Sequence, residues 1–270
     1  MNGIRSAMWS DIIAIRQQRP IILNITNFVA MDLTANALLA MGASPMMAHA
    51  AEEIVELTAL SSALVVNIGT IDSSWHSSMQ LAMDSAAKFK KPCIFDPVGA
   101  GATRYRKNIT REFLERYEIQ CLRGNASEIF ACYNDQESTG GIDNTASSDI
   151  VVEILKQSLL YENRVTVISG AIDYIFGFKR SARIYNGHKI MTEVTAMGCA
   201  ATAIIGAFLA VNSDFFAATV HAMTLMGICG ELAHAKSFGP GSFRTNFLDN
   251  LSAIAEKDLV NTKVDSDEGV

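Results

Sequence analysis

The chain has 270 residues, of which 49% are hydrophobic and 19% charged, and its formal net charge is −6. This composition excludes a disordered or low-complexity protein, and the length allows one to two domains. The acidic balance argues against nucleic acid as the main partner, because proteins that bind phosphate backbones usually carry an excess of lysine and arginine.

Short apolar runs alternate with helical patterns along the first two thirds of the chain. The spacing of Ile4, Met8, Ile12 and Ile15 predicts an amphipathic helix at the start. Five apolar runs, each followed by polar or glycine-rich residues, predict strands. These runs are 21–25, 63–68, 92–95, 119–122 and 165–168, and helices are predicted over 29–41, 73–90 and 148–160.

The pattern predicts an α/β fold, a three-layer α/β/α sandwich with a mostly parallel central sheet. Strands that are apolar throughout are typical of a parallel sheet covered by helices on both faces. Residues 182–185 and 188–191 flank Asn186-Gly187, which predicts an antiparallel hairpin. From Cys199 onward the pattern is helical. We expect residues 1–256 to form a single domain and the polar, acidic residues 257–270 to be a loose tail.

The cysteines and the N-terminus indicate a cytoplasmic protein. The five cysteines are odd in number, widely spaced and without a C-x-x-C, which argues against disulfides and zinc. Residues 1–10 contain no apolar run of the kind that a secretory signal has. Residues 194–213 are uncharged and long enough to span a bilayer, but they contain glycine, threonine and asparagine. A buried helix explains them better than a membrane span.

Three charged residues follow successive predicted strands, at the sheet edge where open α/β folds bind ligands. Asp96, Arg123 and Glu128 could together hold a metal ion and phosphate oxygens. Each also has a purely structural reading: Asp96 as a turn residue before proline, Arg123 as a surface charge, and Glu128 as part of a capping box with Asn125.

The last long uncharged helix begins near Gly198 and Cys199. Free amides and the helix dipole make its N-terminus an anion site, and Gly198 lets an anion approach closely. The dipole favours a thiolate at Cys199. The alternative is a buried helix start in which Cys199 is a small hydrophobic residue.

Other catalytic motifs are absent or incomplete. The sequence has no G-x-x-x-x-G-K-[ST] and no G-x-S-x-G. Gly99-Ala-Gly101 begins a dinucleotide fingerprint, but Arg104 stands at the third glycine. A nicotinamide-dependent oxidoreductase therefore stays as an alternative that NAD(H) binding would test. The five histidines form no pair with metal-ligand spacing.

Motifs along most of the chain resemble the hydroxyethylthiazole kinase family of the ribokinase-like superfamily. In chain order they are Ile25-Thr-Asn27, Thr34-Ala-Asn36 with Leu38-Leu39-Ala40, Gly42-Ala-Ser-Pro45 with Met47, Asn67-Ile-Gly-Thr70, Asp96-Pro-Val-Gly-Ala-Gly-Ala102, Arg123-Gly-Asn-Ala-Ser-Glu128, Asn186-Gly-His-Lys189, Gly198-Cys199 and Gly239-Pro-Gly-Ser-Phe243. No single motif is specific, whereas the ordered set is.

The resemblance implies phosphorylation of the hydroxyl of 4-methyl-5-(2-hydroxyethyl)thiazole by ATP with Mg²⁺, in thiamine salvage. It also implies a homotrimer with active sites between subunits. The implied residue roles are Cys199 and Gly198 in catalysis, Asn27, Val29, Met47 and Ala196 in thiazole binding, Arg123 and Ser169 in ATP binding, and Asp96 and Glu128 at the metal.

Two positions depart from the family pattern. The family usually has threonine where this chain has Ser169, and it reads Gly-x-Gly-Cys where this chain has Ala196. A methyl group at Ala196 restricts φ and puts the fit of the alcohol there in question. Two further alternatives remain: a ribokinase-like kinase that acts on the hydroxymethylpyrimidine, and a non-catalytic binding protein of the same fold.

Overall fold

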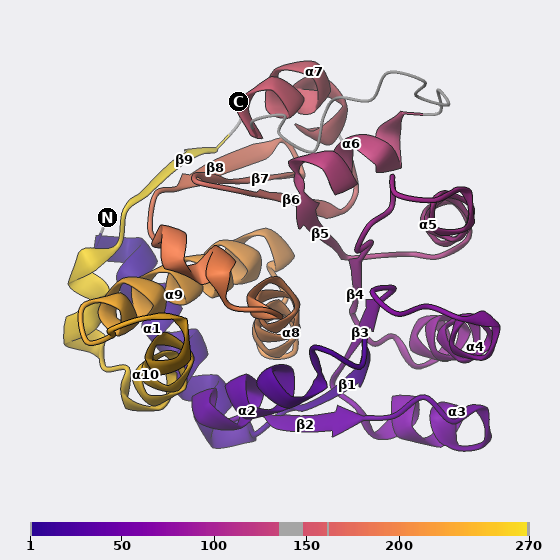
Figure 1. The fold of residues 1–270 in the computed structure, drawn as a ribbon, viewed down its shortest axis with the longest axis horizontal. Helices are drawn as coiled ribbons and strands as arrows, with labels where there is room; N and C mark the ends of the chain where they lie inside the picture. The colour runs from indigo at the N-terminus through magenta and orange to yellow at the C-terminus, as the bar shows by residue number, and fades with distance from the viewer. Residues whose placement is uncertain (1, 135–147, 161, 269–270) are drawn as a thin grey trace.

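A computed structural model describes residues 2–134, 148–160 and 162–268. These residues build one nine-stranded sheet in the order β2-β1-β3-β4-β5-β6-β7-β8-β9 (Figure 1). The strands are β1 (Ile21–Ile25), β2 (Ser44–Met47), β3 (Ala63–Asn67), β4 (Cys93–Asp96), β5 (Cys121–Asn125), β6 (Val165–Ser169), β7 (Asp173–Gly177), β8 (Arg180–Ile184) and β9 (Val264–Glu268). Strands β1 to β6 are parallel, and β7, β8 and β9 continue the sheet in antiparallel pairs.

Helices cover both faces of the sheet (Figure 1). They are α1 (Asn2–Gln18), α2 (Met31–Met41), α3 (Ala51–Leu60), α4 (Ser73–Phe89), α5 (Arg104–Arg116), α6 (Ala126–Tyr133), α7 (Ser148–Leu160), α8 (Met197–Leu209), α9 (Phe215–His234) and α10 (Pro240–Ala253). Successive side chains of a strand point to opposite faces. Ile22 therefore joins a core with α1, α2, α8, α9 and α10, whereas Leu23 joins the core under α3 to α7. The predicted three-layer, mostly parallel architecture is confirmed.

The five predicted strands are present, with ends displaced by up to three residues. Strands β2, β7 and β9 were not predicted. The half-buried β2 begins with Ser44-Pro45 and has no long apolar run, so the sequence carried little signal for it.

The predicted hairpin around Asn186-Gly187 is wrong. Residues 189–193 form a 3₁₀ helix, η1 (Lys189–Glu193), and β8 pairs with β7 instead. The turn between β7 and β8 is made by Phe178 and Lys179, whose φ angles of 53° and 63° are left-handed, as in a type I′ turn. Such turns are usually marked by asparagine or glycine, so this pair gives no sequence signal.

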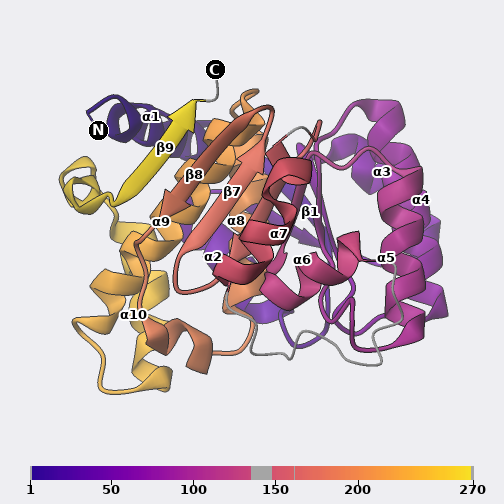
Figure 2. The same ribbon diagram turned by 90° about the horizontal axis from the view of Figure 1, so that it is seen from above.

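The predicted loose tail is also wrong as far as the structure describes it. After η2 (Glu256–Asn261), residues 264–268 form β9, which runs antiparallel to β8 at the sheet edge (Figure 2). The Tyr185 hydroxyl donates to Asp265 Oδ2 at 2.9 Å. Charged side chains are common on exposed edge strands. The acidic composition of these residues therefore led to the prediction of a loose tail where the structure has a strand.

The uncharged segment that suggested a membrane span is a core helix. α8 packs against β1, β3 and β4, and its Gly206 allows close approach to Val65 and Ile22. α9 is long and apolar enough to cross a membrane, yet 78% of its apolar window is buried inside the fold. Burial of this extent is what a core helix shows.

Candidate active site

The carboxyl ends of the parallel strands and the N-terminus of α8 meet around Asp96. This side chain ends β4 and is fully buried. Its Oδ2 accepts hydrogen bonds from Asn67 Nδ2 and Thr202 Oγ1, both at 2.8 Å. Its Oδ1 has no partner among the described residues. Burial raises the pKa of Asp96 to about 6, although Arg123 and the two hydrogen bonds oppose the rise.

Cys199, in the first turn of α8, lies beside two asparagine amides. Its Sγ is 3.3 Å from Asn27 Nδ2 and 3.2 Å from Asn67 Nδ2. Burial raises the pKa of the Cys199 thiol to about 11, with a further contribution from Asp96. Desolvation therefore opposes the thiolate that the helix dipole and the two N–H donors favour, which suits the alternative in which Cys199 is a small residue at a buried helix start.

Arg123, on β5, faces the same helix start. Its Nη2 donates to Ser169 Oγ at 2.9 Å. A Cβ on Gly198 would lie 2.6 Å from Arg123 Nη1, so the guanidinium rests against the backbone of the first helical turn. Arg123 Nε has no partner within the part of the chain that the structure describes. The cation and the amide end of α8 thus direct positive potential into one space.

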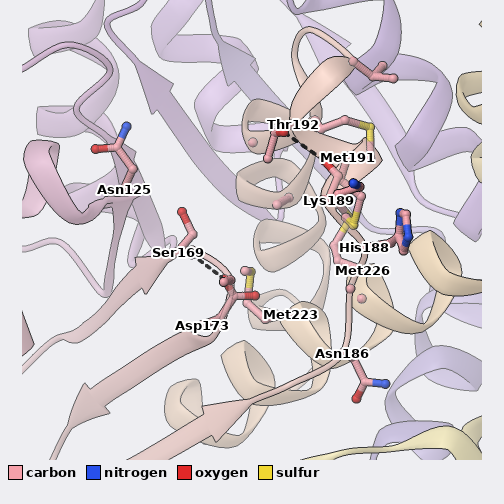
Figure 3. Close-up of a pocket in the computed structure, with 18 of the residues that line it drawn as sticks. Asn125, Ser169, Asp173, Asn186, His188, Lys189, Met191, Thr192, Met223 and Met226 are labelled. Atoms are coloured by element: carbon pink, nitrogen blue, oxygen red, sulfur yellow. Dashed lines mark hydrogen bonds between the residues drawn. The ribbon is translucent and has the colours of Figure 1, made fainter. Parts of the chain in front are cut away.

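That space belongs to a cavity of about 730 Å³, whose lining includes Arg123, Ser169, Ala196 and Gly198. Figure 3 shows Ser169 and Asp173 on the strand side, and Met191 and Lys189 on the opposite wall. The methionines that line the cavity, Met191, Met197, Met223 and Met226, add an apolar surface. A site with a cationic end and an apolar end suits a ligand with phosphates and a flat ring.

Glu128 forms the capping box with Asn125 that the sequence predicted. Its Oε2 accepts from the Asn125 backbone N–H and Asn125 Oδ1 accepts from the Glu128 N–H, each at 2.9 Å, which confirms the capping box. Its Oε1 accepts from the Gly99 N–H at 2.9 Å. Among the described residues, no group of three or more His, Cys, Asp or Glu side chains could hold a metal. The unpartnered Oδ1 of Asp96 is the feature that fits a cation.

The residues expected to bind the thiazole are only partly brought together. Asn27 is buried and reaches Cys199, and Ala196 lines the cavity. Met47 is half-buried at the end of β2, and Val29 is 61% exposed. Neither of these two lines the cavity described above.

The structure adds two polar residues to which the sequence reasoning gave no role. Asn67 ends β3 and contacts both Asp96 and Cys199, and Thr202 donates to Asp96 from the next turn of α8. The spacing of Gly198 and Thr202 places them on one face of a helix, a signal the sequence did contain.

Ala196 caps α8 in a left-handed conformation, with φ 69° and ψ 3°. A left-handed alanine costs about 1–2 kcal/mol that glycine does not pay. The substitution Ala196→Gly should therefore leave the free energy of unfolding unchanged or raise it. Ala210→Gly is the matched control, since Ala210 caps the other end of α8 with φ −68° and is also partly buried.

We expect Ala210→Gly to lower the free energy of unfolding by about 1 kcal/mol, through the low helix propensity of glycine. Urea denaturation of both variants should separate them by about 1–2 kcal/mol. Equal losses in the two variants would show that the backbone at residue 196 is not strained.

The comparisons with known proteins agree with one another. The chain matches the Hydroxyethylthiazole kinase family over residues 12–257. It is 45% identical over 256 residues to a hydroxyethylthiazole kinase of Leptospira biflexa, covering 94% of this chain and 96% of the relative. It is 47% identical over 252 residues to one of Syntrophus aciditrophicus, covering 93% of each.

Solved structures show the same relationship. A hydroxyethylthiazole kinase protein from Pyrococcus horikoshii OT3 superimposes with a TM-score of 0.89 at 38% identity, covering 97% of this chain and 100% of that one. A ribokinase-like superfamily protein from Enterococcus faecalis shares the fold at a TM-score of 0.59 and 12% identity, covering 87% of each chain. The three-layer sandwich is therefore of the ribokinase-like type.

Proposed function

The chain belongs to the hydroxyethylthiazole kinase family, and from this we propose that it transfers the γ-phosphate of ATP to the hydroxyl of 4-methyl-5-(2-hydroxyethyl)thiazole in thiamine salvage. The observation that carries the proposal is the close approach of three groups. The Arg123 guanidinium and Gly198 line one end of the cavity, and the Cys199 sulfur belongs to the same first turn of α8 as Gly198. ATP would place its phosphates at this cationic end.

Phosphoryl transfer leaves the protein little covalent work, so positioning and charge stabilisation dominate. The backbone N–H groups at the start of α8 point out of the helix toward the transferring group. Arg123, whose guanidinium rests against Gly198, binds phosphate oxygens beside these amides, oriented by its bond to Ser169. Both are in place before the reaction, so they stabilise the developing charge without reorganisation.

Cys199 takes a small part in proton transfer. With a thiol pKa of about 11, little thiolate is present in the free protein to accept a proton. In a loose transition state the alcohol loses its proton late, when little basic assistance is needed.

We propose that Asp96 and Glu128 hold Mg²⁺. Asp96 offers a buried oxygen without a partner, and each Glu128 oxygen accepts one backbone N–H, which leaves a lone pair free. When bound, Mg²⁺ would neutralise charge on the phosphates. Apart from this, the chain's own role is to keep Asp96 buried and ionised, for which the donors Asn67 and Thr202 are suited.

We also propose a homotrimer with active sites between subunits. Large apolar side chains lie exposed around α2 and α10: Phe28, Val29, Leu39 and Phe238. These helices pack together, and Arg244 pairs with Asp32 across them. Exposed apolar groups gathered on neighbouring elements are typical of an interface. Val29 is expected to contact the thiazole, yet it is 61% exposed, which suits a pocket completed by a second subunit.

The test is ADP release with ATP, Mg²⁺ and the thiazole alcohol. We expect turnover that depends on the alcohol, and much less with the hydroxymethylpyrimidine. Preference for the pyrimidine would identify the other kinase, and ATP binding without turnover would identify a binding protein. Binding of NAD(H) would support the oxidoreductase alternative. The five free cysteines suit a reducing compartment, so we place this activity in the cytoplasm.

A further inference from the structure

Asn67 sits between the two side chains that flank the reaction space. It is 1% exposed at the end of β3. Its Nδ2 donates to Asp96 Oδ2 at 2.8 Å and to Cys199 Sγ at 3.2 Å. Its Oδ1 accepts from Asn27 Nδ2 and from the Gly69 backbone N–H, both at 2.9 Å. Both amide hydrogens and both oxygen lone pairs are therefore used.

The network allows one orientation of each amide. The Gly69 backbone N–H is only a donor, so it must face the oxygen of Asn67, and the nitrogen must face Asp96 and Cys199. Asn27 is fixed in the same way, because its Oδ1 accepts from the Ala30 N–H at 3.0 Å. The sulfur of Cys199 thus receives two N–H donors, and its own proton points away from both.

Asn27 and Asn67 are closely packed against the backbone of Gly69. A Cβ on Gly69 would lie 2.7 Å from Asn27 Nδ2 and 2.8 Å from its Cγ. Because Gly69 has no side chain, the Asn27 amide has room to donate its hydrogen bond to Asn67 Oδ1. Neither amide can move without losing a bond to a buried partner.

We propose that Asn67 is a positioning residue for phosphoryl transfer, whose single amide nitrogen holds the Cys199 sulfur and the Asp96 carboxylate at a fixed separation. This inference rests on the proposed function. Because one nitrogen donates to both groups, neither the sulfur nor the carboxylate can shift without loss of one of these hydrogen bonds.

The variant Asn67→Asp tests this role, because it keeps the shape and the oxygen that faces Gly69 but removes both N–H donors. The matched control is Asn24→Asp, which makes the same change at a fully buried residue of β1 whose amide donates to the Ile22 carbonyl at 2.8 Å. The first measurement is the rate of Cys199 alkylation by iodoacetamide at one mildly alkaline pH, followed by mass spectrometry of the Cys199 peptide.

In Asn67→Asp the alkylation rate should fall by about threefold or more. Loss of one donor to the sulfur, together with the carboxyl group introduced beside it, lowers the thiolate fraction about tenfold, and the greater nucleophilicity of a more basic thiolate offsets part of this loss. The kcat should fall by about tenfold or more, because Asp96 and the Cys199 sulfur are no longer held in place together, while the KM for ATP changes by less than about threefold. In Asn24→Asp the alkylation rate should stay at the value of the unmodified protein.

A second arm tests whether Asn67 acts through Cys199. In a Cys199→Ala background, Asn67→Asp should reduce kcat by a smaller factor than it does when the sulfur is present. If Asn67→Asp does not fold, as judged by circular dichroism, Asn67→Ser takes its place with the same readouts.

Two results would overturn the proposal: an alkylation rate unchanged in a variant with lowered Tm, or fully additive losses in the double variant. Either result would show that Asn67 stabilises the fold and does not position the Cys199 sulfur and Asp96 for the reaction. Alkylation needs neither ATP nor the thiazole. Absence of kinase activity would therefore contradict the proposed function, and the alkylation rates would still show whether Asn67 acts on the Cys199 sulfur.

Discussion

Replacing Gly198 by alanine should remove most of the phosphoryl transfer while leaving the fold at least as stable. The new Cβ would lie 2.6 Å from Arg123 Nη1 and 3.1 Å from Nη2, so the guanidinium must leave its place. The methyl would also fill the space in front of the amide end of α8. We expect kcat/KM for ATP to fall by about 10²–10³, the loss seen when a preorganised donor to a developing charge is removed.

The free energy of unfolding of Gly198→Ala should stay the same or rise, although its activity falls. Alanine is a better helix residue than glycine, and the clashing atoms belong to the far end of a flexible side chain. The control is Gly3→Ala, since Gly3 is likewise the second residue of a helix and has no atom within 4 Å of its added Cβ. We expect the control to keep normal kinetics. Normal kinetics in Gly198→Ala, with Tm unchanged, would place the phosphate elsewhere.

The substitution Arg123→Ala should weaken ATP much more than the thiazole alcohol. The part-buried guanidinium donates to Ser169, and its Nε is unpartnered among the described residues, so it has donors free for phosphate. A hydrogen bond to a charged group contributes about 1.5–3 kcal/mol, so we expect the KM for ATP to rise about 10-fold to 100-fold. The KM for the alcohol should change by less than about threefold.

Steady-state kinetics with each substrate varied in turn would measure this difference. Arg123→Lys should fall between the unmodified protein and Arg123→Ala, because lysine keeps the charge but loses the forked geometry. Arg116→Ala is a suitable control, since that arginine is exposed and pairs with Asp84 at 3.4 Å on the surface. Equal rises in both KM values for Arg123→Ala would show that Arg123 is not at the nucleotide.

The sequence predicted which segments form strands better than it predicted which strands pair with each other. The runs 63–68 and 165–168 are mostly apolar, and both are interior strands of the sheet. The turn at Phe178-Lys179 and the edge strand β9 were missed, because their formation depends on neighbouring strands and not on local composition.

The candidate site was predicted as a set of residues but not as a geometry. Asp96, Arg123 and Cys199 do gather at one edge of the sheet, as strand ends and a helix start should. The sequence left two interpretations of Cys199 open, because the helix dipole is visible in the sequence whereas the degree of burial is not. Glu128 was given both a metal role and a capping role, and the structure confirms the capping role.

By itself the sequence determined the alternation of strands and helices, the sheet edge at which the polar strand ends gather, and the ordered motifs of a kinase family. These features follow from periodicity and from residue type, which are local properties. The tertiary structure alone decided which side chains touch. Asn67 contacts Asp96, Asn27 and Cys199, which lie 29, 40 and 132 residues away along the chain. Contacts at such separations are set by the packing of the sheet and α8, and the charge state of each buried group depends on them.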